Sequence, residues 1–183
     1  ESVIFAFSGT LDGDGHTIRN LRIDGGSGEA LFGLVSPDGE IRNLGVVDVD
    51  ITGTGHPAGL VANNLGRVLN CYSTGRVISR MNAAAGLVGF NRGSVAGSYS
   101  TAIVEGPIFV GGLVGWNYGT LNDCYVTGSV SGYFYVGGLV GENYDKLTAC
   151  YATVSVNGYD YVGGLVGIHN GGTVQVCYAA GLV

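Results

Sequence analysis

The feature that most constrains this fold is a repeat of 26 or 27 residues that runs through most of the chain. The tripeptide Gly-Leu-Val recurs at steps of 27, 26, 26 and 26 residues, beginning at Gly59, Gly86, Gly112, Gly138 and Gly164. A small residue followed by tyrosine keeps the same interval in Cys71-Tyr72, Ser98-Tyr99, Cys124-Tyr125, Cys150-Tyr151 and Cys177-Tyr178. A fixed period of this length is typical of a solenoid, in which each repeat completes its core only against its neighbours.

Two more divergent copies precede these repeats. The segment EIRNLGV at residues 40–46 matches TIRNLRI at residues 17–23, and both align with RVLNCYS at residues 67–73. Counting these copies, about seven units fill the chain. We therefore expect one solenoid domain over residues 1–183, with divergent coils in residues 1–57 and regular repeats in residues 58–183.

The composition of each unit predicts strands. Its apolar runs are short, rich in Val, Ile, Thr, Tyr and Phe, and broken by Gly, Asn and Asp. In one unit we expect strands at Val110–Val114, Thr120–Thr127 and Ser129–Tyr135. Three strands and three corners per coil describe an all-β protein, a parallel β-helix of about seven coils. We expect it to be right-handed, because parallel crossover connections generally are. A corner that requires a positive φ angle is expected at Gly66, Gly93, Gly119 and Gly172.

The charge of the chain excludes some classes of partner. Eight basic residues are scattered among 14 acidic ones, for a net charge of −6. Nucleic acids and anionic membrane surfaces select clusters of Lys and Arg, so neither is expected as a partner. No apolar run approaches the roughly 18 residues that span a bilayer, so we do not expect membrane insertion. Because the sequence opens at Glu1 and stops inside a repeat, we expect further domains beyond residue 183 or end-to-end association of open strand edges.

Two polar columns follow from the repeat. Equivalent asparagines stand at Asn64, Asn91, Asn117 and Asn143. Such residues can bond the turn backbone and the next amide, which predicts a structural ladder. A second ladder is expected from the cysteines, Cys71, Cys124, Cys150 and Cys177, with Ser98 filling the gap. Buried free thiols are favoured for this column, because neighbouring coils suit disulfide geometry poorly and zinc requires paired short spacings; disulfides and a metal site stay open as alternatives.

Aromatic residues form the candidate binding site. Phe109, Tyr135 and Tyr161 share one register position, and Tyr133 and Tyr159 share another beside it. Exposed stacked rings would give a rigid amphipathic strip for a glycan or for a host or neighbouring protein. The alternative is that these rings only fill the core or stack along the rod.

One acidic segment resembles a calcium loop. In LDGDGHT, Asp12 and Asp14 are separated by glycine, but the later acidic ligand of an EF-hand is missing. A turn that enters the first coil is the favoured interpretation. No cofactor is therefore expected, and calcium at Asp12 and Asp14 stays open as an alternative.

The segment GGLVGWNYGTLNDCYVTGSV at residues 111–130 resembles the GLUG motif, and the resemblance extends over about Ala58 to Val183. This motif belongs to bacterial and archaeal surface or secreted proteins. They include adhesin-like proteins and non-catalytic parts of immunoglobulin A-cleaving metallopeptidases. The resemblance implies an extracellular or cell-surface location and a scaffold without an activity of its own.

These features favour a non-catalytic β-solenoid module that acts in adhesion, in ligand recognition or as a rigid stalk. The alternative is the polysaccharide-binding part of a β-helix carbohydrate-active enzyme, or such an enzyme itself. A glycosidase would need a pair of facing carboxylates, and a lyase a calcium-carboxylate cluster beside a basic residue. The sequence contains no such cluster in one repeat, so no catalytic residue is assigned.

Overall fold

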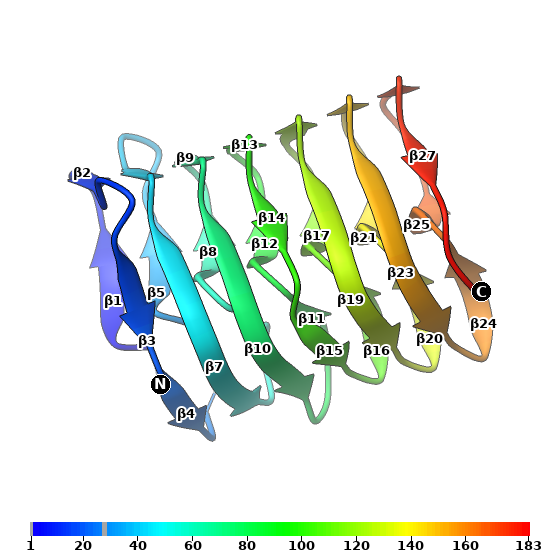
Figure 1. Cartoon of the computed structure of the whole chain (residues 1–183), viewed down its shortest axis with the longest axis horizontal. Helices are drawn as coiled ribbons and strands as arrows, with labels where there is room; N and C mark the ends of the chain where they lie inside the picture. Colours follow the sequence, from blue (N-terminus) through cyan, green and yellow to red (C-terminus); the bar gives the residue numbers. More distant parts are fainter. Residues whose placement is uncertain (1, 27–28) are drawn as a thin grey trace.

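The computed structural model describes residues 2–26 and 29–183, and its strands stack into a β-solenoid of about seven turns (Figure 1). Every strand pair is parallel, and each pair joins one coil to the next. The predicted fold class is thus confirmed. The coils stack along one axis from the N-terminal to the C-terminal end, with strands side by side at roughly 4.8 Å.

Four sheets run along the solenoid. Sheet A contains β1 (Ile4–Phe7), β5 (Phe32–Val35), β8 (Val61–Asn64), β12 (Val88–Asn91), β17 (Val114–Asn117), β21 (Val140–Asn143) and β25 (Val166–His169). Sheet B contains β2 (Thr10–Asp12), β6 (Glu40–Arg42), β9 (Arg67–Leu69), β13 (Ser94–Ala96), β18 (Thr120–Asn122), β22 (Leu147–Thr148) and β26 (Val174–Gln175).

Sheets C and D complete each coil. Sheet C contains β3 (Thr17–Arg19), β4 (Arg22–Asp24), β7 (Gly45–Gly53), β10 (Tyr72–Ser79), β14 (Tyr99–Ser100), β15 (Ile103–Glu105), β19 (Tyr125–Ser131), β23 (Tyr151–Asn157) and β27 (Tyr178–Ala179). Sheet D contains β11 (Ala84–Ala85), β16 (Ile108–Gly111), β20 (Phe134–Gly137) and β24 (Asp160–Gly163). Among residues 2–26 and 29–183, sheet D begins with β11 in the fourth coil, so the described part of the earlier coils has three sheets and the later coils have four.

The predicted strand bounds within a coil were wrong. The segment 110–114 is divided between β16 and β17, and the segment 120–127 is divided between β18 and β19. The interruptions fall at Gly112-Leu113 and at Asp123-Cys124, where the chain turns from one sheet to the next. Asp123 has a φ angle of 52°, so the ladder of an extended strand cannot continue through it.

The predicted glycine corner also needs correction. Gly172 has a φ angle of 80°, but Gly66, Gly93 and Gly119 do not have the positive φ angle that was predicted. A Cβ atom at Gly119 would lie 2.1 Å from the carbonyl oxygen of Gly93 in the preceding coil. These three glycines are therefore required because successive coils approach too closely there for a side chain.

The left-handed corner lies instead between sheets B and C. Equivalent positions in six coils have φ angles of 52–57° and hold Asn43, Asn70, Gly97, Asp123, Ala149 and Val176. Asn and Asp adopt this conformation most readily after glycine, whereas a β-branched residue is strained in it by roughly 1–2 kcal/mol. The corner is built by the geometry of the coil, which overrides the preference of Val176.

The interior is filled by one set of apolar side chains per coil. In the fifth coil the buried residues are Val110, Leu113, Val114, Leu121, Cys124, Val126 and Val130. Equivalent residues of the neighbouring coils belong to the same continuous cluster. At the C-terminal end, β26 and β27 pair with described strands on one side only. End-to-end association through such edges stays a prediction.

A file of asparagine amides connects the coils inside sheet A. The Nδ2 atom of Asn64 donates to Oδ1 of Asn91, Asn91 to Asn117, and Asn117 to Asn143, at 2.8, 2.8 and 2.7 Å. All four side chains are fully buried. The file ends where Nδ2 of Asn143 meets Nδ1 of His169 at 3.0 Å. The amide of Asn117 also donates to the carbonyl oxygen of Gly119 at 2.7 Å, which ties the ladder to the turn.

We predict that Asn117→Ala destabilises the protein by about 3 kcal/mol, because it leaves a buried donor of Asn91 and a buried acceptor of Asn143 without partners. Urea unfolding followed by circular dichroism measures the change. Asn157→Ala, at an exposed position of β23, is the matched control and should stay within about 0.5 kcal/mol of the parent. Equal stability of the two variants would show that the ladder contributes nothing.

Candidate ligand-binding surface

The four cysteines stand at the corner that enters sheet C. All are free thiols, with Cys71, Cys124 and Cys150 buried and Cys177 partly exposed in the last coil. The Sγ atoms of Cys124 and Cys150 donate to backbone carbonyl oxygens of Asn122 and Thr148, at 3.2 and 3.1 Å. Burial raises the pKa of Cys71 to about 11. The contact with Cys124 instead lowers the pKa of Cys150 to about 7. The burial of Cys71, Cys124 and Cys150 suits a packing role, because a thiolate reacts only where reagents can reach it.

The tyrosines that follow this column form a ladder of stacked rings. From Tyr72 through Tyr99, Tyr125 and Tyr151 to Tyr178, neighbouring ring centroids are 4.9, 4.7, 5.0 and 5.1 Å apart, and the rings are within 6° of parallel. Each inner ring is covered on both faces by its neighbours, so solvent meets only ring edges and hydroxyl groups. Burial raises the pKa of Tyr99 and of Tyr125.

Three residues of the predicted aromatic strip form a second stack. Phe109, Tyr135 and Tyr161 lie on β16, β20 and β24, with centroids 4.8 and 4.9 Å apart. All three have left-handed φ angles of 52–56°, which is uncommon for aromatic residues. The central ring, Tyr135, has both faces covered. An apolar ligand can therefore stack on this column only at its ends.

The other two residues of the strip are arranged differently. The side chains of Tyr133 and Tyr159 are 65% and 82% exposed. Tyr159 meets Phe134 edge to face at 6.2 Å, and Tyr133 belongs to no ring pair among the described residues. Both residues are largely exposed to solvent. Of the five residues that the sequence singled out, these two are the most exposed, and Tyr161 at the end of the stack follows at 50%.

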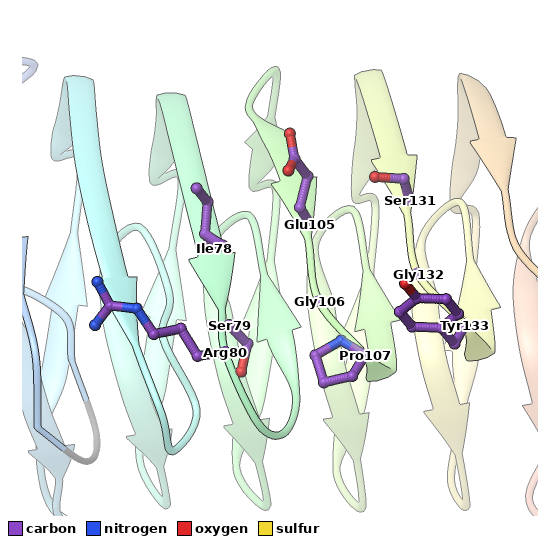
Figure 2. Close-up of a pocket in the computed structure, with 9 residues that line it drawn as sticks. All are labelled: Ile78, Ser79, Arg80, Glu105, Gly106, Pro107, Ser131, Gly132 and Tyr133. Carbon is purple, nitrogen blue, oxygen red and sulfur yellow. The ribbon is translucent and has the colours of Figure 1, made fainter.

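A groove of about 400 Å³ lies beside Tyr133 at the end of sheet C (Figure 2). Three successive coils line it with residues 78–80, 105–107 and 131–133. Gly106 and Gly132 occupy the middle positions. A Cβ atom at Gly132 would lie 2.7 Å from the carbonyl oxygen of Gly106 and 2.8 Å from Cγ2 of Val110, so the bare backbone lies close against the core there. These two glycines line the groove with backbone alone.

The charged side chains at the groove are already paired. Arg80 donates to Asp24 at 2.7 Å, and Arg76 donates to both carboxylate oxygens of Glu105 at 3.0 and 3.1 Å. The four groups together carry no net charge. The groove therefore has polar groups that can exchange hydrogen bonds, but no unpaired cation.

A further aromatic cluster was not predicted from the sequence. Trp116 contacts Phe109, His56 and Phe90, with centroid distances of 4.5, 5.0 and 5.8 Å. Burial lowers the pKa of His56 below its ordinary value. Because Trp116 is surrounded by three other rings, its own faces are largely covered by protein.

Polar groups border this cluster. The rings of Tyr118 and Tyr144 stack at 4.3 Å, and the hydroxyl of Tyr144 donates to Glu142 at 2.8 Å. This hydrogen bond raises the pKa of Tyr144 to about 12. The guanidinium of Arg92 lies 4.9 Å from the ring centroid of Phe90. One signal could have revealed the cluster: Arg92, Tyr118 and Tyr144 each follow a ladder asparagine directly.

The acidic segment near the N-terminus forms a turn. The Oδ1 atom of Asp12 accepts hydrogen bonds from the backbone N–H of Asp14 and from Nδ2 of Asn43, both at 3.0 Å, and Oδ2 accepts one from Arg42 at 2.9 Å. The bond from Asn43 is the main cause that lowers the pKa of Asp12. Protein donors thus occupy both oxygens that a calcium ion would use.

Residues 2–26 and 29–183 lack a clustered metal site and a membrane-spanning helix. In that part of the chain no three His, Cys, Asp or Glu side chains are grouped so as to hold a metal ion. No helix there has the length and apolar character that crossing a membrane requires.

Known proteins resemble this chain in its repeated segments. Residues 110–131 and 132–157 match the family model described as the GLUG motif. Two successive repeats of this chain thus match the GLUG motif. The two matched GLUG segments are the fifth and sixth coils, which hold Tyr133 and the stacked ring of Tyr135.

Two proteins resemble this chain over different lengths. Halomucin from Haloquadratum walsbyi is 38% identical over 74 residues, which cover 39% of this chain and 1% of halomucin. A crystal structure of a candidate immunoglobulin A1 protease from Bacteroides ovatus has a TM-score of 0.76 at 24% identity. That match covers 93% of this chain and 60% of the Bacteroides protein, and it shows a shared fold.

We predict that only Cys177 reacts when the native protein is treated with 5,5′-dithiobis(2-nitrobenzoic acid) at pH 8, because the other three thiols are buried. The absorbance of the released thiolate should report one reactive group in buffer and four in denaturant. In Cys177→Ser the native signal should vanish. Rapid release from two or more groups in buffer would contradict the buried column.

We also predict an acid quench of the single tryptophan. Protonated imidazole quenches indole emission, and His56 lies 5.0 Å from Trp116 with a lowered pKa. The fluorescence should therefore fall with a midpoint below pH 6.5, the ordinary His value. His56→Gln should remove the transition. A midpoint at or above pH 6.5, or a transition that persists in the variant, would contradict this contact.

Proposed function

We propose that this chain is a rigid, non-catalytic recognition module of a larger secreted or cell-surface protein. Its binding surface is the pair of exposed rings at Tyr133 and Tyr159 together with the groove beside them. The ligand is a surface glycan or a partner protein that receives these rings. The stacked columns keep the surface in a fixed shape.

The observation that carries this proposal is the contrast between covered and open rings. The tyrosine ladder and the Phe109 stack are held face to face by their own neighbours. Tyr133 and Tyr159 are instead 65% and 82% exposed, and among the described residues neither is stacked face to face on another ring. Large exposed rings beside a groove are typical of binding sites, since such rings add contact area at low conformational entropy.

The comparisons support an extracellular setting for the module. One relative is a mucin by name, and the similar fold belongs to a candidate immunoglobulin A1 protease. GLUG segments of such proteases are expected to serve outside the catalytic domain. The match to halomucin spans 1% of that protein, which fits a repeated module inside a much longer chain.

The ladders support a rigid module. Hydrogen bonds between asparagine amides and contacts between stacked tyrosines both run along the solenoid axis. Bending the rod would lengthen these contacts on one side. Rigidity favours binding because an ordered surface loses little entropy when its ligand arrives.

The direct test is a binding screen of the chain against arrays of glycans and of extracellular matrix proteins. We predict that the parent binds at least one class and that Tyr133→Ala/Tyr159→Ala binds it at least about tenfold more weakly. Tyr178→Ala is the matched control. That ring is 55% exposed, but it is stacked on Tyr151 and lies in the last coil.

Equal binding by the parent and the double variant would overturn the proposed surface. The absence of binding to every glycan and matrix protein would favour a spacer, in which the solenoid only separates other parts of a longer chain. Circular dichroism of each variant confirms that the coils remain folded.

A further inference from the structure

We infer that the groove at the end of sheet C holds an extended, uncharged polysaccharide that lies along the solenoid axis. This inference rests on the proposed recognition function and names the ligand class of the same surface. The chain would contribute one pair of contact residues per coil, so that successive sugars meet successive coils. The ligand is held without any covalent step.

The repeat itself provides two parallel walls. On one side Glu105, Ser131 and Asn157 occupy the same register position in successive coils of sheet C. On the other side the backbone amide of Tyr133 donates to Pro107, and that of Tyr159 donates to Tyr133, so these three residues form a second row. One row offers hydrogen-bonding groups and the other offers apolar rings. A sugar ring has the same division, with hydroxyl groups at its edge and C–H groups on its faces.

The backbone in the groove argues against a peptide ligand. The amides of Gly106 and Gly132 donate to the carbonyl oxygens of Ser131 and Asn157, at 3.1 and 2.9 Å. The amide of Arg80 donates to Gly53 at 2.7 Å. A peptide strand that adds to a sheet requires free backbone groups at an edge, whereas these groups are already bonded along the axis. Recognition therefore falls to side chains, which suits a ligand rich in hydroxyl groups.

The charge of the groove argues for a neutral polymer. Glu105 is held by Arg76 and Arg80 by Asp24, so an acidic polysaccharide would find no unpaired cation. A carboxylate has about four lone-pair sites, so Glu105 can still accept a bond from a sugar hydroxyl while Arg76 holds it. Ser131 adds one more polar side chain to the lining.

The length of the groove sets the length of the ligand. Three coils line it, and Tyr159 extends the aromatic row by one more coil. Coils are spaced at roughly 4.8 Å. The affinity for a matching oligosaccharide should therefore rise steeply up to about four sugars and change little beyond that length.

The test uses the whole chain and polymers of known charge. Native affinity electrophoresis is run with mannan, laminarin, xylan, galactan and dextran as neutral probes, and with polygalacturonate, alginate and heparin as anionic probes. We expect at least one neutral polymer to retard the chain and the anionic polymers to leave its mobility unchanged. Oligosaccharides of the retarding polymer are then titrated by calorimetry to measure the dependence on length.

Two variants locate the site by different means. Tyr133→Ala removes a ring face, and Ser131→Trp fills the groove from an outward position on β19, while both leave the buried core intact. Each should weaken retardation by about tenfold or more. Tyr178→Ala, at an exposed ring outside the groove, should bind like the parent.

The possible failures are distinguishable from failure of the proposed function. Retardation by anionic polymers alone, or parent-like retardation of both variants, would overturn the inference. Binding to a matrix protein without binding to any polysaccharide would also overturn it, while the proposed recognition function would stand. The absence of binding to every polymer and every protein would overturn both.

Discussion

The structure depends on one constraint: each residue must lie above its equivalent in the preceding coil. Backbone hydrogen bonds between coils set the distance between equivalent residues, and side chains that pack well at this distance form columns along the solenoid. Asparagine suits the constraint because one amide both donates and accepts, so Asn91 bonds to Asn64 on one side and to Asn117 on the other. Tyrosine suits it because rings at the spacing of strands stack face to face. The period in the sequence is the consequence of this stacking.

The sequence predicted which residues share a column, and it predicted little about where their side chains point. The positions of Asn117 and Tyr125 relative to their neighbours follow from counting residues at the period. The strand bounds do not, because breaks such as Gly112-Leu113 depend on how sheets A and D turn into each other. Gly119 was assigned a positive φ angle, whereas its reason is the nearby carbonyl oxygen of Gly93. Contacts between coils of that kind require coordinates.

The candidate site shows the same division. Counting residues placed Phe109, Tyr135 and Tyr161 together, and Tyr133 and Tyr159 beside them. It could not show that the first three rings cover one another and that the last two are open. The left-handed backbone at Tyr135 directs its ring along the column, and no local signal in an aromatic residue predicts that conformation. The groove depends on three coils whose residues 78–80, 105–107 and 131–133 lie side by side, which the period alone does not shape into a hollow. Aromatic residues thus occur both in the stacked columns that stabilise the solenoid and at the proposed binding surface. The stacked rings are assigned to stability and the unstacked ones to recognition.

The most direct test of the central claim measures distances along one column by dipolar electron paramagnetic resonance. Spin labels are placed at Lys146 with Thr120, Ser94 or Arg67, which stand one, two and three coils away. The native cysteines are replaced by serine, the residue that already occupies position 98 of that column. Stacked coils predict distances that grow by roughly 4.8 Å with each coil. Distances that do not increase from Thr120 to Ser94 to Arg67 would contradict the stacking of equivalent residues.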